Sequence, residues 1–239
     1  MSNFSLSYKT YGDTAILIEW PSEIHESILY DIVAFKNKIE DEINLQDIIV
    51  GYNSLLLVSS FKIKNIHDKI RSLKELYNQP SKTKIYKTTH WEIPVCYDQQ
   101  FGIDLDGISQ EKSITKDKII HIHSSPTYTV YFIGFLPGFL YLGGLDEQIA
   151  VPRKSTPRLR VPKGALAIGG SQTGIYPNES SGGWNIIGNS PISFFDAQKA
   201  SPCFAKTGDK ISFKSVSYDE YKMIKEKVNS NVYQLKTIL

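Results

Sequence analysis

Glycine and proline are concentrated in one stretch of this chain, and their density limits what that stretch can fold into. Eleven of the sixteen glycines lie between residues 134 and 188, and six of the eleven prolines lie between residues 137 and 191. Glycine allows backbone angles that other residues resist, and proline restricts its own. The stretch is therefore predicted to contain many tight turns between short strands.

Composition narrows the class of protein. A chain of 239 residues with a formal net charge of +2 can form one large domain or two small ones, and it has no strongly basic field for nucleic acid or anionic lipid. Cys96 and Cys203 are its only cysteines, which fits a reducing cytosol. The N-terminus lacks a signal-peptide pattern, and no apolar run approaches the roughly 20 residues that span a bilayer. We expect a cytoplasmic protein that binds neither nucleic acid nor membrane.

The first part of the chain alternates strand and helix patterns. Apolar periodicity and β-branched runs predict helices at 23–43 and 65–77, the first capped by Ser22, and strands at 14–20, 47–51, 54–59 and 82–95. The order βαββαβ is that of a ferredoxin-like unit. We therefore predict a ferredoxin-like first domain at residues 1–84.

After residue 94 the pattern becomes mainly strands and turns. A helix is predicted at 116–123 with Thr115 as its N-cap, and a closing helix at 217–228. The short strands between them suit an all-β barrel or sandwich. The second domain is predicted at residues 85–239, so the fold class of the whole chain is α+β.

A metal site is not expected. The nearest approach to a metal-binding pair is His121-x-His123, but a two-residue offset on a helix separates the side chains by about 200°. Both histidines are expected to face solvent or a helix cap. The two cysteines are far apart in sequence, and no carboxylates cluster at ligand spacing, so we predict no metal.

Three of the four arginines fall within eight residues, at Arg153, Arg158 and Arg160. The guanidinium group binds carboxylate or phosphate with two parallel hydrogen bonds, so the cluster predicts an anion-binding edge. The alternative is a set of structural ion pairs with the acidic residues Asp146, Glu147 or Asp196.

Other segments of the same stretch are candidates for a pocket. Residues 135–139 place two phenylalanines around a Pro-Gly turn, and they form either an apolar wall for a ligand or partner, or ordinary core. Residues 172–177 and 182–184 combine backbone freedom with polar or aromatic side chains, where turn formation is the alternative to ligand binding. No nucleophile, base and orienting group can be assembled, so the catalytic residues are unknown.

The motifs together resemble a known family. The stretches YTVYFIGFLPGFLYLGGL, VPRKSTPRLRVPKGALAIGG, QTGIYP and SSGGWNIIGNSP resemble the B subunit of 5-oxoprolinase, a family also known as allophanate hydrolase subunit 1-like, which includes a sporulation histidine kinase inhibitor. YGDTAILI, GYNSLLL, WEIPVCYDQQFGIDL and IIHIHSSPTYTV extend the resemblance over nearly the whole chain.

The resemblance implies a fold, partners and site candidates. It implies a ferredoxin-like domain, a cyclophilin-like β-barrel, and two 5-oxoprolinase partners, the C subunit in direct contact and the A subunit. With Arg160 added from the arginine cluster, the candidates for binding the substrate or an anion are Arg153, Arg158, Arg160, Gln172, Thr173 and Tyr176. Candidates for a pocket or partner surface are His123, Tyr128, Phe135, Pro137, Gly138, Phe139, Gly182, Gly183 and Trp184. Two positions depart from the family pattern: Ser181, where proline is usual, and Asn189, where arginine is frequent.

Three functions follow from the resemblance. The leading one is the B subunit of a complex that cleaves 5-oxoproline to glutamate with ATP hydrolysis, and that is inactive without its partners. Since the sequence has no P-loop, the ATP site is either shared with a partner or built from other elements. The second is a protein-binding inhibitor of a histidine kinase, anchored by residues 135–139. The third is a subunit associated with urea carboxylase or allophanate hydrolase.

Overall fold

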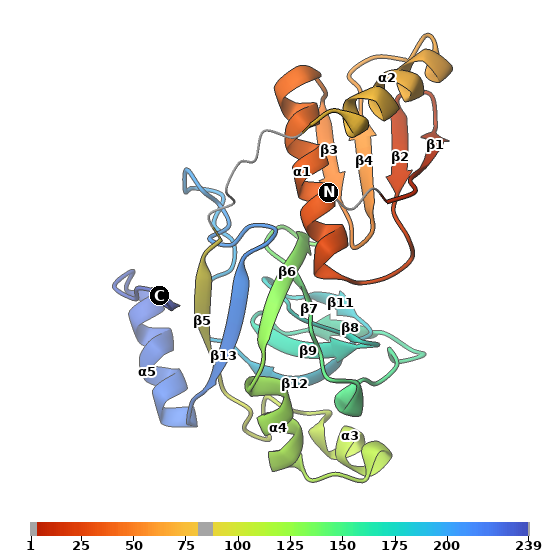
Figure 1. The fold of residues 1–239 in the computed structure, drawn as a ribbon. Helices are drawn as coiled ribbons and strands as arrows, with labels where there is room; N and C mark the ends of the chain where they lie inside the picture. Colours follow the sequence, from red (N-terminus) through yellow and green to blue (C-terminus); the bar gives the residue numbers. More distant parts are fainter. Residues whose placement is uncertain (1–3, 81–87, 239) are drawn as a thin grey trace. The chain divides into compact units, whose positions relative to one another are not determined.

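The computed structural model describes residues 4–80 and 88–238 and divides the chain into two compact units, residues 1–87 and residues 88–239 (Figure 1). Each unit combines helices with a β-sheet, which confirms the predicted α+β class. No helix within the two described ranges is long and apolar enough to cross a membrane.

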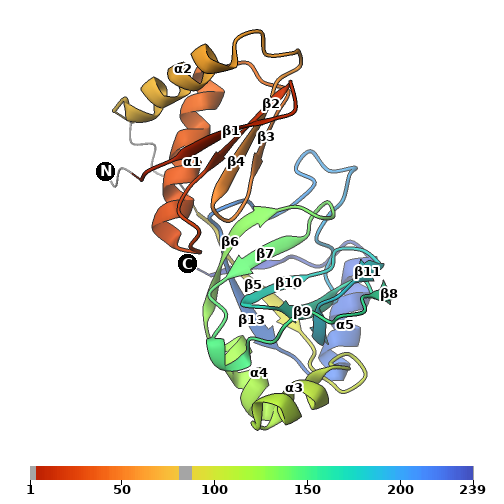
Figure 2. The ribbon, with the colours of Figure 1, turned by 90° about the vertical axis from the view of Figure 1, so that its right-hand side faces the viewer.

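The first unit is a four-stranded antiparallel sheet with two helices. The strand order is β1-β2-β4-β3. Both helices lie over one face of this sheet (Figure 2). The elements are β1 (Ser7–Tyr11), β2 (Ala15–Glu19), α1 (Glu26–Glu42), β3 (Asp47–Val50), β4 (Ser54–Val58) and α2 (Ile66–Asn78).

Alternation along the central strands places the core of this unit. Ile16 and Ile18 of β2 are buried, as are Leu55 and Leu57 of β4, since residues two apart on a strand share a face. The strands predicted at 47–51 and 54–59 are confirmed as β3 and β4, which pair as an antiparallel hairpin. The N-cap of α1 is His25 rather than Ser22, because the side chain of His25 accepts the backbone N–H of Ser27.

The predicted βαββαβ order is wrong in two places. Strand β1, which pairs with β2, was missed in the polar segment at the start of the chain. The last strand was predicted at 82–95. Its first part, residues 82–87, lies outside the described residues, and His90–Val95 forms β5 of the second unit. Hydrogen bonding decides this assignment, because β5 pairs with β13 (Lys210–Ser215) and β14 (Lys236–Ile238), and Ile93 and Val95 belong to the core of the second unit.

The second unit is built on a mixed eight-stranded sheet in the order β12-β9-β10-β7-β6-β13-β5-β14, with a separate two-stranded sheet of β11 and β8. In Figure 1, α5 lies beside β5 and β13, and α3 and α4 pack together. The elements are β5 (His90–Val95), α3 (Leu105–Lys112), α4 (Lys116–Ser124), β6 (Thr127–Ile133), β7 (Leu140–Gly143), the 3-10 helix η1 (Glu147–Ile149), β8 (Arg158–Val161), β9 (Ala165–Gly169), β10 (Gln172–Ile175), β11 (Ser180–Gly182), β12 (Asn185–Asn189), β13 (Lys210–Ser215), α5 (Tyr218–Asn229) and β14 (Lys236–Ile238).

One bridge links strands from opposite ends of this sheet order. Cys96, just after β5, exchanges two backbone hydrogen bonds of 2.9 Å with Asn189 at the end of β12. The sheet therefore curves far enough to bring the first and seventh strands of its order together. Inside the curve, β-branched and aromatic residues of most strands form one buried core.

Two of the three α-helices in this unit were predicted. Thr115 caps α4, and Ser217 caps α5 through a capping box with Glu220. Helix α3 was missed, since it is only eight residues long and contains Gly107. Its C-cap, Ser113, adopts the left-handed conformation that glycine usually supplies at the end of a helix. Because serine stands there instead, the local sequence signal for this helix is weak.

Candidate functional site

An aromatic pocket lies within the glycine- and proline-rich stretch. Its volume is about 290 Å³, and its lining comes from the loop between β6 and β7, strand β7, the segment before β8, and the β10–β12 region. The lining residues, called the aromatic pocket below, are Phe135, Phe139, Tyr141, Arg153, Lys154, Pro157, Tyr176, Ser181, Gly182, Gly183 and Trp184.

Phe139 organises the aromatic wall. Its ring is only 1% exposed and meets Tyr176 edge-on at a centroid distance of 5.1 Å and Trp184 at 5.5 Å. Tyr141 packs against both Phe139 and Trp184. Edge-to-face contacts of this kind fix ring orientation as well as burying area. The pocket wall is thus part of a small satellite core and is held rigidly.

Glycine is required where these rings approach the backbone. A Cβ at Gly182 would lie 2.3 Å from the hydroxyl of Tyr176, and one at Gly169 would lie 2.6 Å from the indole of Trp184. Both distances are shorter than van der Waals contact, so any side chain there would push the aromatic ring out of place. The glycines of this stretch therefore shape the pocket as well as its turns.

Phe135 differs from the rest of the wall because it is strained and exposed. Its φ is 65°, a left-handed conformation that is uncommon for bulky residues, and its side chain is 60% exposed. The turn is held by the backbone hydrogen bonds of Gly134 and Phe139, and Gly138 also has a positive φ. Pro137, in the same turn, is exposed and does not line the pocket. Strain of this kind is found at binding sites, where surrounding structure maintains it.

Arg153 is the exposed cation of the pocket. Its guanidinium lies over the ring of Trp184 at 5.4 Å and donates a hydrogen bond of 3.4 Å from Nη2 to Oε1 of Gln172. No salt bridge to Arg153 is found among the described residues. Its positive charge is therefore available to an anion, while Trp184 and Gln172 restrict its orientation.

Arg158 is held by a carboxylate that sequence reasoning missed. Oδ1 of Asp104 accepts hydrogen bonds from Arg158 at 2.6 Å and from Lys154 at 2.9 Å, and Oδ2 accepts the backbone N–H of Ile186 at 2.7 Å. The three acidic residues expected from the sequence as ion-pair partners are not the partners of Arg158. Burial raises the pKa of Asp104, but the hydrogen bonds from Arg158, Lys154 and Ile186 outweigh it and hold the pKa below its usual value.

Arg160 stands apart from both. Its side chain is 84% exposed and lies 3.7 Å from Glu179, an exposed pair of the kind that contributes little to stability. The three arginines of one segment thus have three different environments. Only Arg153 lines the aromatic pocket.

His123, Tyr128 and Thr173 are in the core, whereas a pocket or partner surface was expected for His123 and Tyr128 and substrate or anion binding for Thr173. His123 has no exposed surface, and its two ring nitrogens lie 3.0 Å from the hydroxyl of Tyr97 and 2.9 Å from Oγ1 of Thr173. The hydroxyl of Tyr128 donates to the backbone carbonyl of His123. Burial lowers the pKa of His123 to about 3, so this ring is neutral at physiological pH. The expectation that both histidines face solvent or a cap is wrong for His123, while His121 is exposed.

Two tyrosines supply hydroxyl groups near the pocket. Burial raises the pKa of Tyr141, although the charge of Arg153 opposes that shift. Burial likewise raises the pKa of Tyr176, against smaller opposing contributions from Trp184 and the arginines. Both phenols therefore stay protonated and can donate hydrogen bonds at neutral pH.

The structure gathers seven of the predicted residues in this pocket, together with Gln172 through its contact to Arg153. The seven are Phe135, Phe139, Arg153, Tyr176, Gly182, Gly183 and Trp184. Sequence reasoning missed Tyr141, Lys154, Pro157 and Ser181. Tyr141 carried a usable signal, because it lies two residues from Phe139 and so shares its face of an extended segment. The described residues hold no group of three or more His, Cys, Asp or Glu side chains placed to bind a metal.

The departure at Asn189 has a structural explanation. Its side chain accepts a hydrogen bond of 2.8 Å from the hydroxyl of Tyr221 and donates one of 2.9 Å to the carbonyl of Lys163. It is 5% exposed and joins α5 to the sheet. Asparagine at this position therefore serves packing, whereas Ser181 lies at the pocket itself.

Comparison with known proteins places this chain in a defined class. Residues 6–205 match the family described as "Carboxyltransferase domain, subdomain C and D". The chain is 39% identical over 202 residues to the B subunit of 5-oxoprolinase from Haemophilus influenzae, covering 84% of this chain and 94% of that protein. It is 33% identical over 230 residues to the B subunit of 5-oxoprolinase from Bacillus subtilis, covering 91% and 96%. The chain belongs to the family of 5-oxoprolinase B subunits.

A solved structure shows the same fold in a larger protein. The chain superposes on the urea amidolyase of K. lactis with a TM-score of 0.82 at 20% identity, over 98% of this chain and 16% of that one. At this identity the likeness concerns the fold alone. It shows that the architecture recurs as one part of a larger protein.

Proposed function

We propose that this chain acts as the B subunit of a cytoplasmic, ATP-dependent 5-oxoprolinase that cleaves 5-oxo-L-proline to L-glutamate together with the A and C subunits. In this proposal the aromatic pocket holds the substrate. The observation that carries it is the combination of one exposed, oriented guanidinium with a rigid apolar wall, because 5-oxoproline pairs a carboxylate with a compact lactam ring.

Each part of the substrate has a counterpart in the pocket. Arg153 binds the carboxylate, and Gln172 and Trp184 keep the guanidinium in position. Phe139 and Trp184 contact the ring methylenes. The protonated hydroxyls of Tyr141 and Tyr176 supply donors for the lactam carbonyl.

The pocket binds and orients the substrate, and other groups complete the reaction. Its lining, as far as the chain is described, contains no histidine, cysteine or carboxylate that could act as general base. The pocket also does not fit ATP. A triphosphate needs several donors, whereas the cations here are Arg153 and Lys154, and Lys154 is already paired with Asp104. We therefore place the nucleotide outside this pocket, at a site that is shared with a partner or built from other elements.

Direct contact with the C subunit is assigned to two exposed apolar side chains. Phe135 is 60% exposed and Leu159, between Arg158 and Arg160, is 90% exposed. Large apolar side chains left in water are typical anchors of an interface. The curved sheet joined by the Cys96–Asn189 bridge supports the proposal that this unit is a cyclophilin-like barrel.

Co-expression with the A and C subunits tests the function. The complex is purified, and ATP-dependent release of glutamate from 5-oxoproline is measured with each of the three chains omitted in turn. We expect activity from the full set and none when this chain is absent. A stable complex that does not cleave 5-oxoproline would contradict the substrate, and unchanged activity without this chain would contradict its role in the complex.

A further inference from the structure

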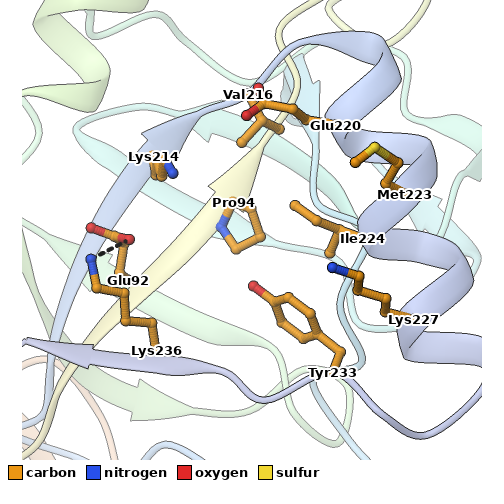
Figure 3. A pocket seen from close by; sticks show the side chains of 10 residues that line it. All are labelled: Glu92, Pro94, Lys214, Val216, Glu220, Met223, Ile224, Lys227, Tyr233 and Lys236. Carbon is orange, nitrogen blue, oxygen red and sulfur yellow. Dashed lines mark hydrogen bonds and ion pairs between the residues drawn. The ribbon is translucent and has the colours of Figure 1, made fainter.

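A second pocket lies in the same unit and shares no lining residue with the aromatic pocket. It has a volume of about 270 Å³ and lies between α5 and strands β5, β13 and β14 (Figure 3). We call it the α5 pocket. All of its lining residues except Glu92 and Pro94 follow residue 205, where the family match ends.

Incomplete strand pairing opens this pocket. Strand β14 pairs only with residues 90–92 of β5, so the outer edge of β5 beyond Glu92 has no strand partner there. Pro94, on that free stretch, has no backbone N–H to offer another strand. Its ring and the side chain of Ile224 form an apolar floor, and Ile224 and Tyr233 pack against the main core of the unit.

The turn after α5 brings two polar groups to the same place. Asn231 adopts a left-handed conformation with φ of 56°, which reverses the chain. The carbonyl of Lys227 then accepts the backbone N–H groups of both Val232 and Tyr233. In Figure 3 the ammonium of Lys227 and the hydroxyl of Tyr233 both point toward the space below Pro94.

These two groups are available to a ligand. Among the described residues, neither the ammonium of Lys227 nor the hydroxyl of Tyr233 has a hydrogen-bond or ion-pair partner. Burial, and secondarily the charge of Glu92, raises the pKa of Tyr233, so its hydroxyl remains a donor at neutral pH. An ammonium and a phenol that converge over an apolar floor match a carboxylate with an apolar body.

The negative charges at the pocket are already engaged. Glu92 pairs with Lys236 at 3.1 Å. Glu220 accepts the backbone N–H of Ser217 at 2.9 Å in the capping box at the start of α5. Lys214 adds a further positive charge to the lining. The three lysines of the lining therefore outweigh its two glutamates, and the pocket favours an anion.

We propose that the α5 pocket binds a small organic carboxylate with an apolar body, in which Lys227 and Tyr233 hydrogen-bond the carboxylate and Pro94 and Ile224 contact the apolar part. The volume is close to the lower limit of about 300 Å³ for small-molecule sites, which favours a small acid over a peptide. The inference concerns this chain alone and is independent of the proposed 5-oxoprolinase activity.

Met223 offers a direct readout, because it lines the pocket and the chain contains only one other methionine, Met1. The full chain is labelled with 13C-methyl methionine and titrated with benzoate, and separately with benzamide, which has the same shape without the charge. We expect a saturable shift of the Met223 methyl resonance with benzoate and none with benzamide.

Variants locate the binding. Lys227→Gln and Tyr233→Phe are each expected to weaken benzoate binding about tenfold or more, since a hydrogen bond to a charged group is lost. Lys225→Gln is the matched control on the same helix, because its ammonium lies over the ring of Tyr221 and does not line the pocket. It is expected to bind benzoate as the wild type does.

Several results would overturn the proposal. One is the absence of a saturable Met223 shift with millimolar benzoate, and another is equal binding of benzamide. Undiminished binding by both Lys227→Gln and Tyr233→Phe, with thermal unfolding like that of the wild type, would place the ligand elsewhere. A glutamate-rich hexapeptide that binds more tightly than benzoate would make the pocket a peptide site instead.

Discussion

Arg153 and Arg158 lie five residues apart in the same proline-rich segment, yet the fold gives them different tasks. Arg158 donates to the buried carboxylate of Asp104, which also holds Lys154 and the backbone of β12. Arg153 remains exposed over Trp184. The difference teaches that an arginine cluster need not act as a unit. One guanidinium stabilises the wall of the pocket, and the other is exposed at the pocket, where we propose that it binds the ligand.

The largest effect is expected from removing the carboxylate that holds Arg158. Asp104→Ala leaves two cations and the backbone N–H of Ile186 without their acceptor, so the free energy of unfolding should fall by about 3 kcal/mol. Urea denaturation measures this loss. Asp106→Ala is the control, since Asp106 makes an exposed pair with Lys116, and it should change stability by less than about 0.5 kcal/mol. Equal losses in the two variants would contradict the special role of Asp104.

The contribution of Asp104 should also depend on pH. Its folded pKa is lower than its unfolded pKa, so its stabilisation is complete above the unfolded value of about 3.9 and is lost as the pH falls through the folded value. The stability difference between wild type and Asp104→Asn should therefore narrow below about pH 4. Unfolding free energies measured from pH 7 down to pH 3 test this, and a constant difference would exclude the linkage.

The exposed arginine should affect activity rather than folding. Arg153→Ala is expected to lower kcat/KM of the assembled complex for 5-oxoproline about 10- to 100-fold, which corresponds to the loss of a charged hydrogen bond. Thermal unfolding should change little, because an exposed cation–π contact contributes only about 0.5–1 kcal/mol. Arg153→Lys keeps the positive charge but loses the two parallel hydrogen-bond donors of the guanidinium group, so an intermediate activity is expected. Wild-type activity in Arg153→Ala would remove this residue from the site.

The smallest effect is expected at Arg160. Since its side chain is largely exposed and its pair with Glu179 is long, Arg160→Gln should change both the unfolding free energy and the activation free energy by less than about 0.5 kcal/mol. The same urea and kinetic measurements apply. A loss of activity comparable to that of Arg153→Ala would show that the arginines of the cluster act together, and would contradict the different roles assigned to them here.

Prediction from sequence succeeded where the signal is local. Helices α4 and α5 carry their capping residues next to an apolar periodicity, and the hairpin of β3 and β4 has two apolar runs around a short turn. The first unit was misread because β1 is mostly exposed and β5 has the same apolar character whichever sheet it joins. Pairing with β13, which is distant in sequence, decided which sheet β5 joins.

By itself, the sequence determined the α+β class, the family, and the segment in which the aromatic pocket forms, because turn chemistry, periodicity and motif order are local properties. Only the tertiary structure decided which residues share that pocket. It buried His123 and Thr173, brought Asp104 to Arg158 over more than fifty residues of chain, and left Arg153 exposed. The physical reason is that charge availability depends on partners from other strands and helices, and no spacing within one segment reports them.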